Sequence, residues 1–364
     1  MNIERALSLN IETPYMVVDL DQTIRNIRKM QEIANKNKKA LRPHVKTHKM
    51  PYLARIQIEE GAIGIAVQKL AEAEVMCAGG VNDILISNEV VDKRKCDRIA
   101  KLASEGCKIS VAVDSLIGAK CLSESASHYG VTIPVLIDVN VGMNRCGVDP
   151  ENVISFYRQL KEFPNIKVIG LMAYDGHVLN PNPSKRKQMV EAEYKAIEGI
   201  FKELKKLDEN IHVLSVGGTP TAEFWAQFDE VTELQPGTYV FCDVHYSELG
   251  LCTLDEISMG VVAQVISMKE GERIVLDAGY KAISLDQGVY PIALNENGIV
   301  GNVIGMYEEH TVIKPVQKGI TIGDKVLLLP YHACTTTDMW DYAWFFEGNK
   351  PPMRIPILAR GKRE

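Results

Sequence analysis

The sequence predicts an α/β protein that combines a (β/α)8 TIM barrel with a smaller all-β domain. From about residue 14, short β-rich runs alternate with amphipathic segments of helical periodicity. Repeated βα units indicate parallel strands with right-handed crossovers, and eight or nine such units favour a closed barrel over an open doubly wound sheet. After residue 250, strands alternate with turns and no long amphipathic helix follows, which indicates the all-β domain.

The barrel is expected to span residues 12–245, and the β domain residues 246–364 together with 1–11. Helices are expected between most barrel strands, with clear apolar stripes in 21–36 and 188–207. The expected strands are 14–20, 40–47, 63–67, 83–87, 108–114, 132–140, 167–174, 212–218 and 231–241 in the barrel, and runs within 259–279, 301–314 and 320–330 in the β domain.

Composition and charge exclude several classes of protein. The 364 residues carry a formal net charge of −6 and are 46% hydrophobic, which suits a soluble globular protein with a sizeable core. The mild acidity and the lack of an Arg-rich tract argue against nucleic acid as a main partner. No apolar run reaches membrane-spanning length, and the first ten residues lack the apolar core of a signal peptide. Eight scattered cysteines without a disulfide framework predict reduced thiols and a cytoplasmic protein.

The segment LRPHVKTHKM, residues 41–50, concentrates basic side chains in one apolar run. On an extended strand, alternate side chains share a face. If that face points into the barrel, burial and like charge favour a neutral, nucleophilic amine at Lys46, which can condense with an aldehyde. A barrel-mouth lysine that neutralises a nearby acid is the alternative interpretation. The basic residues that would share the face are Arg42, His44, Lys46 and His48.

Two glycine-containing turns follow neighbouring expected strands. SVGGTPTAEF, residues 215–224, contains a strand end, two glycines and a helix start with Pro220 at a favoured position. Glycines allow an anion to approach closely, and N–H groups at a helix start bind phosphate. The next strand ends in LQPGTYVF, residues 234–241, and two such turns together favour a phosphate site more than either alone. Arg145, just past another strand, is placed to pair with a phenolate or a carboxylate.

Ten motifs spread along the chain carry a family resemblance. In chain order they are TPYMVVDLD, RPHVKTHK, VQKLAEAE, DILISNEVV, MNRCGV, GLMAY, GGTPTAEF, TELQPGTYVF, IVLDAG and PYHAC. Together they resemble the D-threonine aldolase and eukaryotic-type D-serine dehydratase family, whose members are pyridoxal phosphate enzymes with the alanine-racemase, or type III, fold. The resemblance implies an N-terminal barrel, a C-terminal β domain and a homodimer with active sites near the subunit interface.

The resemblance implies a role for each matching residue. Lys46 would form a Schiff base with pyridoxal 5'-phosphate. Arg145 in MNRCGV would hold the phenolic oxygen of the cofactor, and Tyr174 in GLMAY would lie against its pyridine ring. Gln235 falls where alanine racemases carry an arginine that faces the ring nitrogen, and Gln68 would be a weaker cofactor contact. The phosphate would be bound by Gly217, Gly218, Thr219, Gly237 and Thr238.

His332 and Cys334, in PYHACTTTD, are two residues apart and would face the same way on extended backbone. Imidazole and thiolate together suit zinc, although catalytic zinc usually has three protein ligands. Taken alone, such a pair is more often a packed cysteine beside a hydrogen-bonded histidine. The resemblance implies a divalent-metal pair here, His with Asp in the aldolases and His with Cys in the dehydratases, so we expect zinc or manganese.

A metal-assisted lyase of D-β-hydroxy-α-amino acids is the implied function. A Lewis acid at the β-hydroxyl can promote cleavage of the Cα–Cβ bond, which yields glycine and an aldehyde, or loss of the hydroxyl, which yields ammonia and a 2-oxo acid. ISNEVV and TELQPGTYVF are more aldolase-like, whereas His-x-Cys is more dehydratase-like. The aldolase base histidine would fall near Asn180, which cannot accept a proton, so His177 is expected to substitute. Retro-aldol cleavage is slightly favoured over dehydration of D-serine or D-threonine.

Two further functions stay open. An amino-acid racemase of the same fold would need a second base opposite Lys46 but would not need His332 and Cys334. A non-catalytic pyridoxal phosphate carrier would resemble single-barrel proteins, which lack a C-terminal β domain. The expected partner is a small-molecule D-amino acid, and D-threonine, D-allo-threonine, D-serine and 3-hydroxy-D-aspartate all remain open.

Overall fold

A computed structural model describes residues 1–364, and the chain forms two compact units. The predicted domain limits, 12–245 for the barrel and 246–364 with 1–11 for the β domain, stay a prediction. The same holds for the assignment of the cofactor to the barrel and of the metal to the β domain. The barrel unit comprises residues 29–46, 51–237 and 361–364, and the β unit comprises residues 1–28, 47–50 and 238–360.

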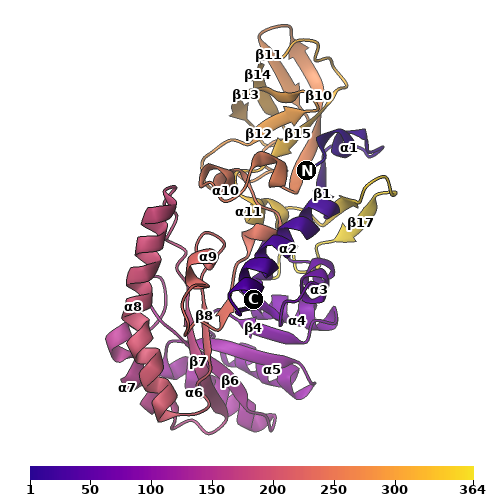
Figure 1. The fold of residues 1–364 in the computed structure, drawn as a ribbon. Coiled ribbons are helices and arrows are strands. Elements are labelled where there is room, and N and C mark those ends of the chain that lie inside the picture. The colour runs from indigo at the N-terminus through magenta and orange to yellow at the C-terminus, as the bar shows by residue number, and fades with distance from the viewer. The chain divides into compact units, whose positions relative to one another are not determined.

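Eight parallel strands form the barrel unit's sheet, which confirms the predicted barrel (Figure 1). The strands run in the order β2-β9-β8-β7-β6-β5-β4-β3, and a parallel bridge between His44 and Ala66 joins the first to the last. The strands are β2 (Ala40–Leu41), β3 (Ile65–Val67), β4 (Asp83–Ile86), β5 (Lys108–Val113), β6 (Ile133–Asp138), β7 (Ile166–Ala173), β8 (Val213–Val216) and β9 (Glu233–Leu234).

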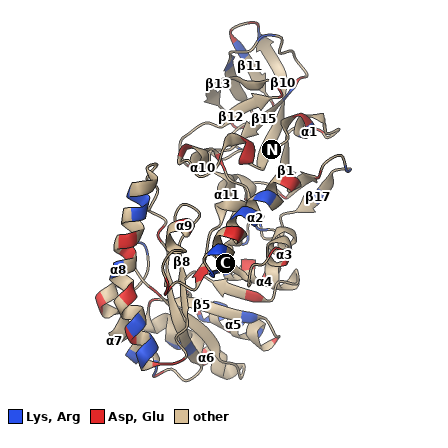
Figure 2. Ribbon diagram, viewed as in Figure 1, with Lys and Arg blue, Asp and Glu red and all other residues tan.

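Amphipathic helices alternate with these strands, as the βα pattern predicts. The longest, α8, begins at a side-chain cap from Asn182 with Pro183 at its first position. Its apolar residues, such as Val190, Ile197 and Phe201, are buried, while charged residues follow its length in Figure 2. The helices are α3 (Pro51–Glu59), α4 (Leu70–Ala78), α5 (Lys93–Ser104), α6 (Leu116–His128), α7 (Val153–Leu160), α8 (Pro183–Leu207) and α9 (Ala222–Trp225), and α2 (Leu20–Lys36) contributes residues to both units.

Apolar packing connects five neighbouring strands of the barrel. Five consecutive strands, β3 to β7, each contribute one side chain to a buried apolar cluster. The cluster mixes small and large side chains, which pack these strands against one another. The members are Ala66, Leu85, Ala112, Leu136 and Met172.

The β unit contains a nine-stranded sheet in the order β11-β14-β13-β12-β15-β10-β1-β16-β17, which confirms the predicted all-β texture after residue 250. Its pairings are antiparallel except for β1 with β16. Its elements are α1 (Ile3–Ser8), β1 (Tyr15–Asp19), α10 (Val244–Glu248), β10 (Met259–Lys269), β11 (Arg273–Leu276), β12 (Ile292–Asn295), β13 (Gly298–Met306), β14 (Thr311–Pro315), β15 (Lys325–Leu329), α11 (Ala333–Thr337), β16 (Tyr342–Phe346) and β17 (Met353–Pro356).

The expectation that residues 14–20 form a barrel strand is wrong. The strand exists as β1, but it pairs with β10 and β16 in the β unit. All five residues of β1 are buried. A strand that is buried on both faces has a continuous apolar sequence in a parallel barrel sheet and in a largely antiparallel sheet alike. Its composition therefore does not show which strands it pairs with.

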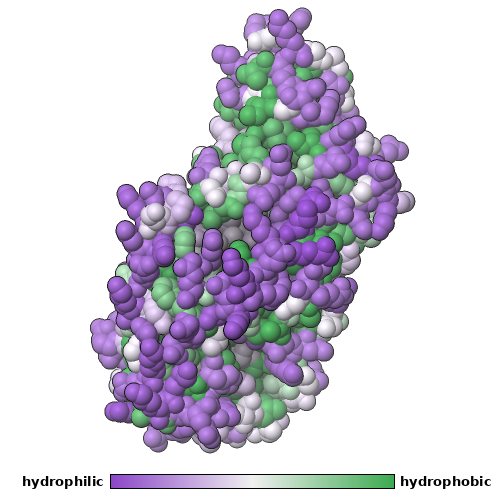
Figure 3. Space-filling view, viewed as in Figure 1, coloured by the Kyte–Doolittle hydropathy of each residue, from purple (hydrophilic) through white to green (hydrophobic).

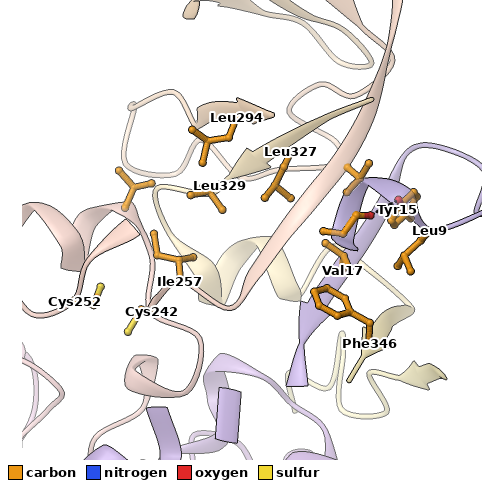
Figure 4. Close-up of a cluster of buried hydrophobic side chains, with 13 residues drawn as sticks. Leu9, Tyr15, Val17, Cys242, Cys252, Ile257, Leu294, Leu327, Leu329 and Phe346 are labelled. Carbon is orange, nitrogen blue, oxygen red and sulfur yellow. Dashed lines mark hydrogen bonds between the residues drawn. The ribbon is translucent and has the colours of Figure 1, made fainter. Parts of the chain in front are cut away.

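A core of the β unit packs the N-terminal segment against strands from the other end of the chain (Figure 4). Tyr15 and Val17 of β1 lie in one apolar cluster with Leu327 and Leu329 of β15 and Phe346 of β16. The Tyr15 hydroxyl donates to the carbonyl of Ala6 at 2.9 Å, so the one polar atom of this ring is satisfied. This burial holds β1 in the sheet.

Large hydrophobic side chains are also exposed on the β unit, and Figure 3 shows hydrophobic surface on it among hydrophilic residues. Three of them, Ile299, Ile304 and Tyr307, lie on β13 or just after it. No helix is long and apolar enough to span a membrane.

Candidate functional site

Lys46 lies in a short 3-10 turn, Val45–Thr47, and not in an extended strand. Strand β2 ends at Leu41, and Pro43 cannot donate a ladder hydrogen bond because it has no N–H. The prediction that four basic side chains share one strand face is therefore wrong. Arg42 is instead bound by Glu233 (3.1 Å) and by Asp83 (2.7 Å) at the start of β4.

A small cavity adjoins Lys46 at the ends of the barrel strands. The Lys46 amine and the Arg145 guanidinium lie 5.4 and 5.2 Å from the centre of the Tyr174 ring. The structure therefore brings together residues from separate motifs that the sequence assigned to the cofactor. This cavity, the candidate cofactor cavity, is lined by His44, Lys46, Gln68, Ser87, Arg145, Met172, Tyr174 and Gln235.

Hydrogen bonds fix the walls of the cofactor cavity. His44 Nδ1 accepts from the backbone N–H of Lys46 at 3.2 Å, and its Nε2 lies 3.0 Å from Ser87 Oγ. Ser87 in turn donates to the carbonyl of Val67 at 3.0 Å, so the chain of bonds places the imidazole proton on Nε2. Just after β9, the Gln235 amide nitrogen donates to Oγ of Ser215 on β8. Sequence reasoning assigned no role to Ser87, although this residue lies in the motif DILISNEVV.

The first glycine turn lies beside the cavity. Gly217 has a φ of +78°, and a Cβ on it would stand 2.9 Å from the Trp225 ring, so glycine is required there. A Cβ on Gly218 would stand 3.5 Å from the Tyr174 ring. Because β8 and β9 pair in parallel, the residues that follow Val216 and Leu234 begin at the same edge of the barrel.

These features fit an anionic aromatic aldehyde such as pyridoxal phosphate. A lysine amine, an arginine and an aromatic ring share the cavity, and a turn that tolerates only glycine lies beside the ring. Thr219, Gly237 and Thr238 follow the same two strand ends, and their binding of phosphate stays a prediction.

Carboxyl groups cluster next to Arg145. Burial, with the nearby charge of Glu89, raises the pKa of Asp138 to about 8. Ligand atoms of Glu89, Asp114 and Cys146 lie within 4.8 Å of one another, and Asp114 accepts from the backbone of Gly147 at 3.2 Å. Glu89 and Cys146 lie in the motifs DILISNEVV and MNRCGV, but sequence reasoning assigned no role to this cluster beside the arginine.

His177 lies in the loop after β7, with its Nε2 3.2 Å from Glu193 Oε1 on α8. Burial, together with the charge of Asp175, raises the pKa of Glu193 to about 9. Asp175 itself is buried, and one of its oxygens accepts from the Trp225 indole at 2.7 Å. The His177 side chain is about one third exposed.

His332 and Cys334 are brought together, but not by extended backbone as predicted. His332 is extended and caps α11, whereas Cys334 is already helical. Burial would lower the pKa of His332, but hydrogen bonds to Cys334 and Asp286 outweigh this effect and raise it to about 9. Thr47 Oγ1 lies 3.2 Å from Cys334 Sγ. An imidazole and a thiol in contact fit a zinc-type donor set.

Comparison with known proteins identifies the family. The alanine racemase N-terminal domain matches residues 18–244, and a serine dehydratase domain matches residues 258–346. D-threonine aldolase from Arthrobacter sp. is 35% identical over 91% of this chain and 88% of its own length. The chain belongs to the D-threonine aldolase and D-serine dehydratase family. Members named here are aldolases and dehydratases, which are lyases, and this chain is an enzyme of that class.

Solved structures of the family share this fold. D-threonine aldolase from Filomicrobium marinum superimposes with a TM-score of 0.90 at 29% identity, covering 97% of each chain. A variant of D-threo-3-hydroxyaspartate dehydratase in its metal-free form has a TM-score of 0.89 at 26% identity, covering 95% of this chain and 97% of that one. The family fold, that of alanine racemase-like pyridoxal phosphate enzymes, therefore extends over both units.

Proposed function

We propose that the protein is a pyridoxal phosphate- and divalent metal-dependent lyase that cleaves D-β-hydroxy-α-amino acids to glycine and an aldehyde. The observation that carries this proposal is the cofactor cavity, in which Lys46 and Arg145 face the Tyr174 ring. The 35% identity to a D-threonine aldolase favours cleavage of the Cα–Cβ bond.

In this proposal the cavity residues hold and orient the reactants. When bound, the cofactor supplies a ring that withdraws electrons from the amino acid's Cα. Lys46 would bond to the cofactor in the resting enzyme, and its amine, once released, would return a proton to Cα of the glycine product. Arg145, Tyr174, Gln68 and Gln235 would position the ring.

The metal pair, His332 and Cys334, is assigned to the β-hydroxyl. When bound, a divalent metal supplies a Lewis acid that lowers the pKa of a hydroxyl group. Thiolate and imidazole favour zinc, and manganese is the other candidate. His177 would accept the hydroxyl proton, because its ring is partly exposed and its Nε2 is held by Glu193.

The deciding experiment incubates the enzyme with D-threonine and with D-serine, with and without added zinc or manganese. Glycine and ammonia are measured separately. We expect glycine and acetaldehyde from D-threonine, no ammonia, and dependence on the metal. Ammonia with a 2-oxo acid would instead assign the enzyme as a dehydratase.

Dehydration is the second candidate, because the donor pair contains a cysteine and a solved relative is a dehydratase with a metal-free form. Interconversion of D- and L-amino acids without added metal would favour a racemase. A yellow protein that is inert toward all these substrates would favour a carrier. The homodimer and the cytoplasmic location also stay proposals, and the exposed Ile299, Ile304 and Tyr307 are candidates for a dimer contact.

A further inference from the structure

Asp286 lies in the loop between β11 and β12, 46 residues before His332, and no motif singled it out. We propose that Asp286 is the positioning residue that orients His332 as a ligand of the divalent metal. This inference rests on the proposed metal site at the metal pair and adds a third residue, which acts through the imidazole.

Asp286 Oδ2 lies 2.7 Å from His332 Nδ1. An ionised carboxylate only accepts hydrogen bonds, so Nδ1 carries the ring proton and donates it. In the neutral imidazole, the other nitrogen, Nε2, then has a lone pair available for a metal. The carboxylate thus selects the tautomer that can ligate through Nε2.

The carboxylate of Asp286 is itself held in place from both sides. Its Oδ1 accepts from Thr335 Oγ1 at 2.9 Å and from Ser284 Oγ at 3.0 Å, and its Oδ2 accepts from Gln287 at 3.0 Å. Thr335 follows Cys334 directly, so one carboxylate contacts the residues on both sides of the thiol-bearing turn. Rotation of the His332 ring would therefore require several bonds to break.

The thiol is oriented by separate contacts. Cys334 Sγ meets Thr47 Oγ1 at 3.2 Å and Thr238 Oγ1 at 3.7 Å, and the His332 side chain hydrogen-bonds to Cys334. The backbone N–H between the two ligands, that of Ala333, donates to the buried Asp243 at 3.1 Å. Both side chains are thus held by neighbouring residues before a metal arrives.

A carboxylate that orients the histidine would strengthen metal binding at a site with only two protein ligands. Metal-binding histidines commonly donate their second N–H to a carboxylate, and loss of that partner lowers metal affinity about 10- to 100-fold. With only two protein ligands, this site depends strongly on their orientation, so Asp286 should have an effect in that range.

The test measures the zinc dissociation constant of the full-length protein by competition with a chromogenic chelator. We expect Asp286→Ala to weaken zinc binding about 10- to 100-fold. Asp286→Asn should lose less, because its amide oxygen still accepts the Nδ1 proton. Glu308→Gln removes an exposed carboxylate of the same unit and should bind zinc like the wild type.

A second readout separates orientation from folding. At saturating Co²⁺, the thiolate-to-cobalt absorption band should persist in Asp286→Asn, because Cys334 still ligates. Loss of that band would overturn the proposal, since Asp286 would then maintain the whole loop. Equal weakening by Asn and Ala would also overturn it, in favour of direct ligation by Asp286.

The outcome distinguishes this inference from the proposed function. If the wild type binds zinc and Asp286→Ala binds it within twofold as tightly, only the role of Asp286 fails. If the wild type binds neither zinc nor Co²⁺, the proposed metal site and the inference fail together, while the cofactor assignment is unaffected.

Discussion

The cofactor cavity and the metal pair are assembled in different ways. The cavity collects side chains from distant parts of the chain, such as Lys46, Arg145 and Gln235, because parallel strands end at one edge of the barrel. The metal pair comes from neighbouring residues at the start of one short helix, and its orientation depends on a partner 46 residues away. Topology alone can gather the first set, whereas the second needs a specific supporting side chain.

The largest expected effect is that of Lys46→Ala. This change should remove the visible absorbance of cofactor bound as an imine and reduce lyase activity to background, since the covalent link is lost. Absorption spectra and product assays of purified protein check it. Lys101→Ala, an exposed lysine on α5, is the matched control and should keep both signals. A persistent visible band in Lys46→Ala would contradict the assignment of the cavity.

Removal of the metal should affect the role of the metal pair and leave the binding of the cofactor in the cavity unchanged. Treatment with a chelator is expected to lower activity about 1,000-fold, because the Lewis acid supplies several kcal/mol of transition-state stabilisation. The visible absorbance should be unchanged, because Lys46 and the cavity residues belong to the other set. Zinc or manganese should restore activity. Full activity of metal-free protein would show that the metal pair has no role in the reaction.

His177→Ala tests whether His177 is the base that accepts the proton of the substrate's β-hydroxyl. We expect a loss of about 100-fold in kcat, near the lower end for a missing general base, with little change in KM. Steady-state kinetics with D-threonine measure both values. His128→Ala, an exposed histidine at the end of α6, should have no effect. A KM effect alone would assign His177 to substrate binding.

Glu193 is expected to affect stability and its dependence on pH rather than activity. Burial raises its folded pKa from the ordinary 4.5 to about 9, so the folded state binds a proton that the unfolded state releases above pH 4.5. Stability should therefore fall as pH rises between these values, at up to about 1.4 kcal/mol per pH unit for one proton.

Glu193→Gln should remove this slope and be more stable than the wild type at pH 8. Denaturant unfolding between pH 5 and 8.5 measures it. Glu191→Gln, an exposed carboxylate on the same helix, should keep the slope of the wild type. Identical pH profiles of Glu193→Gln and the wild type would mean that Glu193 is ionised in the folded protein.

Much of the architecture followed from periodicity. Alternating β-rich runs and amphipathic helices predicted the barrel, and the change of texture after residue 250 predicted the second sheet. The strand at Tyr15–Asp19 was assigned to the wrong sheet, because its uniformly apolar composition suits both. Lys46 was expected on a strand, but Pro43 ends the ladder and a 3-10 turn follows.

The sequence by itself predicted five residues that line the candidate cofactor cavity, because they lie in local motifs and the barrel topology brings strand ends to one edge. They are Lys46, Gln68, Arg145, Tyr174 and Gln235. It also predicted the metal pair, whose two residues lie in one motif. Only the tertiary structure revealed Ser87 beside His44, Glu193 beside His177 and Asp286 beside His332. Each of these partners is a common polar residue far from its histidine in the chain. Its role arises from a hydrogen bond made across the fold, and no local pattern encodes such a contact.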